Sequence, residues 1–113
     1  MQIIMMTEGL TAKEKYALSY NQGIEKMSDH VGETIDVDKF IMYQDEQENG
    51  TVTVLSILTE DGTILATNSQ TFIRDFTRIA EMFTEDGEEI PRLLIYGGTS
   101  KNDRQFIACS VAM

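Results

Sequence analysis

The residues best suited to binding chemistry lie near the end of the chain. Lys101 and Arg104 flank a polar, glycine-rich turn, and the aromatic residues Tyr96 and Phe106 stand on either side of it. Glycines let another backbone approach closely, cations can contact phosphates, and rings can stack on bases. We therefore interpret the stretch 96–106 as a candidate site for single-stranded nucleic acid. The alternative is a solvated hairpin whose rings pack inward, because glycine-rich turns are common.

A second group with similar side chains lies earlier in the chain. Lys39, Phe40 and Tyr43 belong to one β-like stretch, and Lys26 and His30 precede it. These residues could line part of the same groove. The alternative places Phe40 in the core and Lys39 on an ordinary surface, and for Phe40 we expect the core. Tyr43, at the polar end of the stretch, is the better candidate for stacking.

Catalytic chemistry has little support in this sequence. His30 is the only histidine, so a histidine-based metal site has no second imidazole. Cys109 alternates with apolar residues and is expected to be a buried thiol. The stretch 97–101 lacks the ending of a phosphate-binding loop. We expect no enzyme, no metal and no cofactor. The alternative is a small enzyme with paired carboxylates, although nineteen acidic residues make chance pairs common.

The composition is that of one folded domain in a reducing compartment. A length of 113 residues leaves little chain for a second core, and a hydrophobic content of 42% is ample for one. The single cysteine cannot form an internal disulfide, which favours a cytoplasmic location. No stretch approaches the roughly 20 apolar residues that span a bilayer, so we expect no membrane partner.

The formal net charge of −10 bears on any nucleic-acid partner. A field of that sign repels a polyanion at long range and argues against broad binding of duplex DNA. At physiological salt this repulsion is screened beyond about 8 Å, so the local placement of cations can outweigh the total charge. Stacking contributes about 1–3 kcal/mol per base. An acidic chain can therefore still hold a single strand in a local basic groove.

Sequence patterns divide the chain into alternating helical and β segments. Thr11 and Glu14 fit a capping box at the start of a short helix. Asp61-Gly62 predicts a tight hairpin turn, and residue 68 or 69 is expected to cap a second helix. The predicted elements are a loosely structured segment 1–10, a helix 11–22, strands 34–44, 51–59 and 63–67, a helix from 70 to 85, and strands 92–96 and 104–111.

The order of three strands, a helix and two strands is that of the OB-fold, a five-stranded and partly open barrel. We predict a mainly β protein with one long helix, in which 25–113 form an OB-fold-like five-stranded barrel (β-β-β-α-β-β). Residues 1–24 form an N-terminal extension with the short helix. The first strand loses its alternation near Lys39, which predicts a bulge. A β-grasp fold or an SH3-like barrel with an inserted helix is the alternative.

Several short pieces carry a family resemblance through their order and spacing. They are Ser28–Ile35, Phe40–Tyr43, Thr59–Thr63, Ala66–Ser69, Gly98–Lys101 and Arg104–Phe106. From about residue 25 onward, the chain resembles the small single-stranded DNA-binding proteins of tailed bacteriophages of Gram-positive bacteria. The resemblance covers about four fifths of the chain and does not extend to the first helix.

The resemblance implies a non-catalytic OB-fold that coats unwound DNA during phage replication or recombination, without strong sequence preference. Carried over by position, Tyr43, Tyr96 and Phe106 are implied as stacking rings, and Lys39, Lys101 and Arg104 as phosphate contacts. Phage replication or recombination proteins and a second copy of the chain are further expected partners. The rival hypothesis is an acidic interaction module or DNA mimic, which convergence of the three cations on one groove would disfavour.

Overall fold

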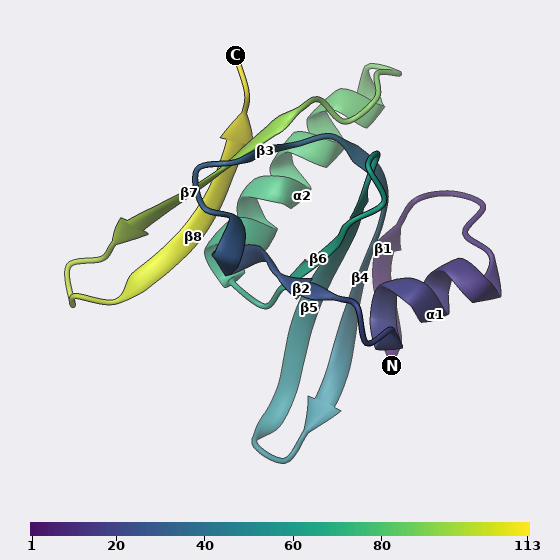
Figure 1. Ribbon diagram of the computed structural model, residues 1–113, viewed down its shortest axis with the longest axis horizontal. Coiled ribbons are helices and arrows are strands. Elements are labelled where there is room, and N and C mark those ends of the chain that lie inside the picture. The colour runs from purple at the N-terminus through teal and green to yellow at the C-terminus, as the bar shows by residue number, and fades with distance from the viewer.

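The computed structural model describes residues 1–113 and contains both helices and strands (Figure 1). The elements are β1 (Gln2–Met6), α1 (Ala12–Tyr20), β2 (Glu25–Lys26), the short 3-10 helix η1 (Met27–His30), β3 (Thr34–Ile35), β4 (Val37–Gln47), β5 (Gly50–Thr59), β6 (Ile64–Thr67), α2 (Gln70–Glu85), β7 (Leu93–Thr99) and β8 (Gln105–Val111). Neither α-helix is long and apolar enough to cross a membrane.

The strands form two sheets, and no closed barrel is present. The larger sheet has the order β1-β4-β5-β6-β2, with β2 parallel to β6 and the other pairs antiparallel, and the smaller sheet has the order β3-β7-β8. The prediction of a five-stranded barrel is therefore corrected to a mixed fold with two helices. The last strand, β8, pairs only with β7 and packs against α2, so it does not join the larger sheet.

One stretch of backbone contributes to both sheets. Thr34 and Ile35 pair with β7, whereas the chain from Val37 onward pairs with β5. The single strand predicted over 34–44 is thus interrupted at Asp36. The predicted bulge near Lys39 is confirmed by a shift in register between Val37 and Lys39.

The N-terminal segment is more ordered than expected. Residues 1–10 were predicted to be loosely structured, but β1 pairs with β4 along the edge of the larger sheet. The capping box of α1 is confirmed, because the Thr11 hydroxyl accepts the Glu14 N–H and the Glu14 carboxylate accepts the Thr11 N–H. The prediction missed β1 because its pairing partner lies more than thirty residues away.

The long helix α2 follows the sequence prediction closely. The Ser69 hydroxyl caps it by accepting the Phe72 N–H, and Asp86 is its C-cap residue. Gly87 adopts a φ of 74°, which suits the residue after a helix. Phe72, Phe76 and Ala80 are buried on one face of the helix. This apolar face anchors α2 against the sheets.

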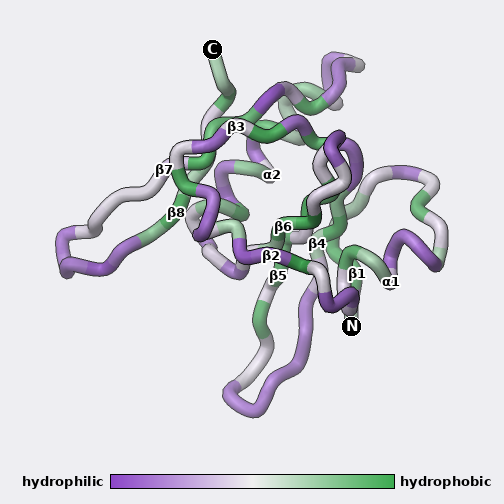
Figure 2. The backbone as a smooth tube through the Cα atoms, viewed as in Figure 1, coloured by the Kyte–Doolittle hydropathy of each residue, from purple (hydrophilic) through white to green (hydrophobic).

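Apolar side chains fill two clusters on opposite faces of the larger sheet. The main cluster contains Phe40 and Met42 of β4 together with the buried face of α2. The smaller cluster contains Ile41 and Tyr43 of the same strand, covered by Leu18 of α1. Because successive side chains point to opposite faces, β4 is buried on both sides. Hydrophobic segments gather in the body of the molecule, and hydrophilic segments mark the tips of the β4–β5 and β7–β8 hairpins (Figure 2).

Candidate nucleic-acid interface

The β7–β8 hairpin extends away from the body of the molecule (Figure 1). At its tip the Ser100 N–H donates to the Arg104 carbonyl at 2.8 Å, and the Arg104 N–H donates to the Ser100 hydroxyl at 3.3 Å. Asp103 completes the turn with a φ of 58°, in the left-handed region. These bonds fix the turn that carries Lys101 and Arg104.

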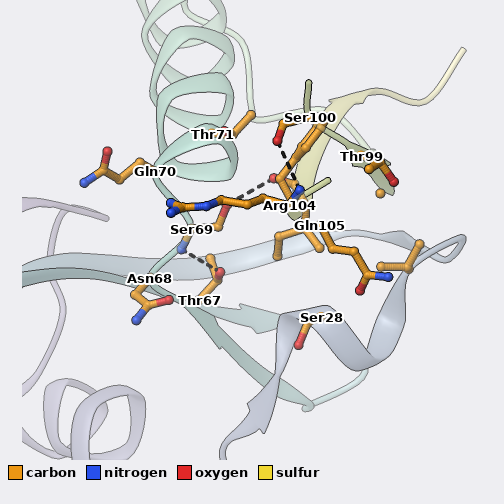
Figure 3. A pocket seen from close by; sticks show the side chains of 15 residues that line it. Ser28, Thr67, Asn68, Ser69, Gln70, Thr71, Thr99, Ser100, Arg104 and Gln105 are labelled. Carbon is orange, nitrogen blue, oxygen red and sulfur yellow. Dashed lines mark hydrogen bonds between the residues drawn. The ribbon is translucent and has the colours of Figure 1, made fainter. Parts of the chain in front are cut away.

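A groove lies at the base of this hairpin, where the smaller sheet meets the start of α2. It has a volume of about 960 Å³, and only three of its fifteen lining residues are hydrophobic. The lining residues, which define what we call the hairpin groove, are Ser28, Val31, Thr67, Asn68, Ser69, Gln70, Thr71, Gly97, Gly98, Thr99, Ser100, Arg104, Gln105, Phe106 and Ile107 (Figure 3).

The start of α2 forms one wall of the groove. The Ser69 hydroxyl donates to the Ile107 carbonyl at 3.1 Å, and the Ser69 N–H donates to the Thr67 hydroxyl at 3.0 Å. These bonds tie the helix start to β8 and β6. The first turn of α2 contains no acidic residue, so the partial positive charge of the helix end is not neutralised there. Such a helix end favours phosphate groups.

Phe106 packs its ring against the backbone of the opposite strand. It pairs with Gly98, and a Cβ atom at Gly98 would lie 2.6 Å from the Phe106 Cζ atom. Glycine is therefore needed for this close approach. Phe106 is half-buried and lines the groove, so its ring is fixed on one side and partly accessible on the other.

Tyr96 lies on the same face of the hairpin as Phe106. Tyr96 pairs with Ala108, two residues along β8 from Phe106, which makes the two aromatic residues diagonal neighbours. The Tyr96 side chain is 40% exposed, whereas its neighbour Ile95 is fully buried. Tyr96 does not line the groove itself. It extends the aromatic surface along the outer face of the hairpin.

The cations of the hairpin are free of ion pairs. Arg104 and Lys101 are exposed, and neither lies within salt-bridge distance of a carboxylate. The Arg104 side chain lies across the groove, with its guanidinium group toward the start of α2 (Figure 3). An unpaired guanidinium next to a helix N-terminus is well placed to bind a phosphate.

Lys39 and Tyr43 lie elsewhere, on β4 of the larger sheet. Lys39 forms an ion pair with Glu14 of α1, which lowers the Glu14 pKa to about 2. Tyr43 is 7% exposed and packs in the smaller cluster with Leu10 and Leu18, and this burial raises its pKa. The structure therefore brings Tyr96, Lys101, Arg104 and Phe106 together but separates Lys39 and Tyr43 from them.

The histidine and the cysteine are engaged within the fold. His30 Nδ1 lies 3.1 Å from the Glu33 carboxylate and Nε2 lies 3.0 Å from the Glu25 carboxylate, which together raise the His30 pKa. Cys109 is buried, and desolvation raises its pKa to about 12. A thiol of that kind is not a reactive nucleophile.

Sequence reasoning missed the wall of the groove opposite the hairpin. Ser28 and Val31 reach it from the segment after β2, and the side chain of Val31 lies 3.5 Å from the Cβ position of Gly97. No local signal marks these residues, because contacts between distant parts of the chain bring the two segments together. The Gly32 N–H donates to the Ile95 carbonyl, the Ile95 N–H donates to the Glu33 carbonyl, and β3 pairs with β7. Ser69 was recognised as a helix cap, but its place in the groove was not.

Comparison with known proteins assigns the chain to a family. The family model described as phage single-stranded DNA-binding protein, of the phi29 type, matches residues 7–112. No curated protein and no solved structure matches the chain significantly. Because the match covers nearly the whole chain, including both helices, the chain belongs to the phi29-type family of phage single-stranded DNA-binding proteins.

Proposed function

We propose that the protein holds single-stranded DNA in the hairpin groove without sequence preference and protects the strand during phage replication or recombination in the infected host. The observation that supports this site most directly is the convergence of three features on one groove. These are the partly accessible ring of Phe106, the unpaired guanidinium of Arg104 and the N-terminal end of α2. Together they offer a surface for a base and two groups for its phosphates.

Two further residues of the hairpin extend this site. Tyr96 offers a second ring on the same face as Phe106, and Lys101 offers a second cation at the tip. Every base has a flat face, so binding through rings tolerates any sequence. Lys39 and Tyr43 contribute to the packing of α1 on β4 in this proposal, and we assign them no contact with DNA.

We also propose that the fold is an opened form of the OB barrel. In an OB-fold a long first strand is shared between two halves of a partly open barrel. The stretch 34–47 pairs with β7 at one end and with β5 at the other, as such a strand would. The bidentate ion pair between Asp36 and Arg92, at 2.9 and 3.1 Å, holds the crossing point. Residues 1–24 then form an extension that adds β1 to the edge of the larger sheet and packs α1 on one of its faces.

The site is tested by fluorescence anisotropy with labelled oligo-dT and with duplex DNA across a salt series. We expect measurable binding of the single strand that weakens as salt rises, and little binding of duplex. Phe106→Ala should weaken single-strand binding by about 1–3 kcal/mol, because a stacking ring is removed. Met82→Ala is the control, since Met82 is an exposed apolar residue of α2 outside the groove.

The same titration can refute the proposed site. If Phe106→Ala and Arg104→Gln both bind oligo-dT as tightly as the unaltered protein, the strand does not occupy the hairpin groove. Circular dichroism of each variant separates a loss of binding from a loss of fold.

A further inference from the structure

The helix α1 exposes two neighbouring tyrosines to solvent, and neither of them lines the hairpin groove. Tyr16 and Tyr20 are 63% and 57% exposed, and their ring centroids lie 6.0 Å apart. They are spaced one helical turn apart, while Leu18 faces the smaller cluster. The chain has four tyrosines, and two of its three exposed ones are on this helix. Two adjacent exposed rings form an apolar patch, and such patches often coincide with interaction sites.

Basic side chains accompany these rings. Lys13 lies one turn before Tyr16 on the exposed face of α1, whereas Lys15 is half-buried on another side of the helix. Neither lysine lies within salt-bridge distance of a carboxylate, and the one acid of the helix, Glu14, is paired with Lys39. The outer face of α1 therefore combines flat rings with an unneutralised positive charge.

The distribution of charge along the chain singles out the same helix. The stretches 9–24 and 90–113 contain only two of the nineteen acidic residues, Glu14 and Asp103, but five of the nine basic ones. The first stretch carries α1 and the second carries the β7–β8 hairpin. Together they carry a formal charge of +3 in a molecule with a net charge of −10, and this lowers the electrostatic cost of approach for a polyanion.

A short segment connects α1 to the hairpin groove. The chain leaves α1, forms β2, and reaches Ser28 and Val31 at the wall of the groove. Lys26 of β2 is exposed and forms no ion pair, while of the acids on either side of it Glu25 is paired with His30 and Asp29 is exposed. In Figure 1, β2 runs across the face of the molecule from α1 toward η1.

From these observations we infer that α1 is a second stacking surface for single-stranded DNA, on which Tyr16 and Tyr20 hold bases of the strand that occupies the hairpin groove. The inference depends on the proposed function of that groove. The longest dimension of the molecule is 41 Å, so a strand spanning it needs on the order of 12 nucleotides at about 3.4 Å each. That length lies within the range of about 4–16 nucleotides that OB-fold proteins cover.

The test compares two lengths of labelled oligo-dT by anisotropy, about 5 and about 16 nucleotides, near the two ends of that range. The double variant Tyr16→Ala/Tyr20→Ala should bind the long oligonucleotide about fivefold more weakly or worse, because its bases can no longer stack on the rings. Binding of the short one, which the hairpin groove can hold alone, should change much less. Tyr16→Phe/Tyr20→Phe keeps the rings and should bind both lengths like the unaltered protein.

A second measurement addresses the lysines. In Lys13→Gln/Lys15→Gln, the slope of log affinity against log salt should decrease in magnitude by about 0.7 for each phosphate that a lysine no longer neutralises. All these side chains are at least partly exposed, so the variants are expected to fold, which circular dichroism checks. An unchanged slope would show that neither lysine binds the strand.

The outcomes separate this inference from the proposed function. If Tyr16→Ala/Tyr20→Ala leaves the long oligonucleotide unaffected while Phe106→Ala weakens it, α1 does not contact the strand and the groove assignment stands. If the α1 variant weakens binding and Phe106→Ala does not, the groove assignment fails and α1 is the principal site. If Tyr16→Ala/Tyr20→Ala loses the same affinity for the short and the long oligonucleotide, α1 does not act as a second surface that only the longer oligonucleotide reaches.

Discussion

At the scale of single residues, the contact between Phe106 and Gly98 decides how the candidate site is built. The ring rests on a position without a side chain, because a Cβ atom there would lie 2.6 Å from Cζ. Gly97 next to it has ordinary room, with its nearest neighbours 3.5 Å from the same position. The two adjacent glycines therefore provide a matched pair of positions for testing whether DNA binding depends on the position of the Phe106 ring.

We expect Gly98→Ala to weaken oligo-dT binding by about 1 kcal/mol or more while Gly97→Ala leaves it nearly unchanged. The added methyl group displaces the Phe106 ring from its position against β7, whereas at Gly97 a methyl group makes normal van der Waals contact. Anisotropy measures binding, and urea unfolding confirms that both variants are folded. Equal affinities for the two variants would show that the ring position is unimportant.

The tyrosines of the two sheets should respond differently to truncation. Tyr43→Ala removes a ring that is only 7% exposed and should cost about 3 kcal/mol of unfolding free energy. Tyr96→Ala removes an exposed ring, so we expect little change in stability and a loss of binding of about 1 kcal/mol. Urea unfolding and anisotropy on the same samples distinguish these effects. Loss of DNA binding in a fully folded Tyr43→Ala protein would return Tyr43 to the site.

At the scale of elements, most of the fold was predictable from local signals. The hairpin at Asp61-Gly62, the capping of α1 and α2, and the hairpin between β7 and β8 all follow from residues close in sequence. The errors concern long-range pairing. The prediction missed β1 and made Tyr43 a stacking residue, because nothing within β4 indicates what the start of the chain does. That segment pairs β1 with the edge of β4 and covers the second face of β4 with Leu10 and Leu18.

The ion pair between Glu14 and Lys39 fastens α1 to β4, and its contribution depends on pH. The Glu14 pKa falls from an ordinary 4.5 to about 2 in the folded protein, chiefly through its bond to Lys39. A carboxyl group whose pKa is lower in the folded state stabilises the fold at pH values above its pKa in the unfolded state. This stabilisation is lost as the pH falls through its pKa in the folded state. The relevant window lies between pH 4.5 and about 2.

We expect Glu14→Gln to be less stable than the unaltered protein at pH 6, with the difference shrinking as pH falls through this window. Glutamine at this position preserves the capping box, so the variant removes the charge and keeps the helix start. Urea unfolding at several pH values measures the difference. A difference that stays constant down to pH 2 would contradict the role of the ion pair.

At the scale of the whole molecule, acidic residues are concentrated away from α1 and the β7–β8 hairpin. Asp45, Glu46 and Glu48 lie at the tip of the β4–β5 hairpin, which extends from the body in a different direction (Figures 1 and 2). A further cluster, 85–89, follows α2. The β4–β5 tip points away from the β7–β8 hairpin, and the groove is lined by the opposite end of α2, so both groups of acids act on DNA mainly through long-range repulsion that salt screens.

Replacing the three tip acids by their amides, as Asp45→Asn/Glu46→Gln/Glu48→Gln, changes the formal charge from −10 to −7. We expect both single-stranded and duplex DNA to bind more tightly at low salt, because long-range repulsion is reduced. The gain should vanish at about 1 M salt, where the screening length is about 3 Å. A gain that persists there would indicate a direct contact of the tip with DNA.

This segregation of charge also governs how neighbouring copies share one strand. Two copies side by side on one strand each carry a formal net charge of −10, so they repel each other. This repulsion sets the distance between neighbouring molecules on the strand, and the distance becomes shorter when salt screens the repulsion. The number of nucleotides occupied per molecule at saturation should therefore fall as salt rises, even while the affinity of each molecule declines.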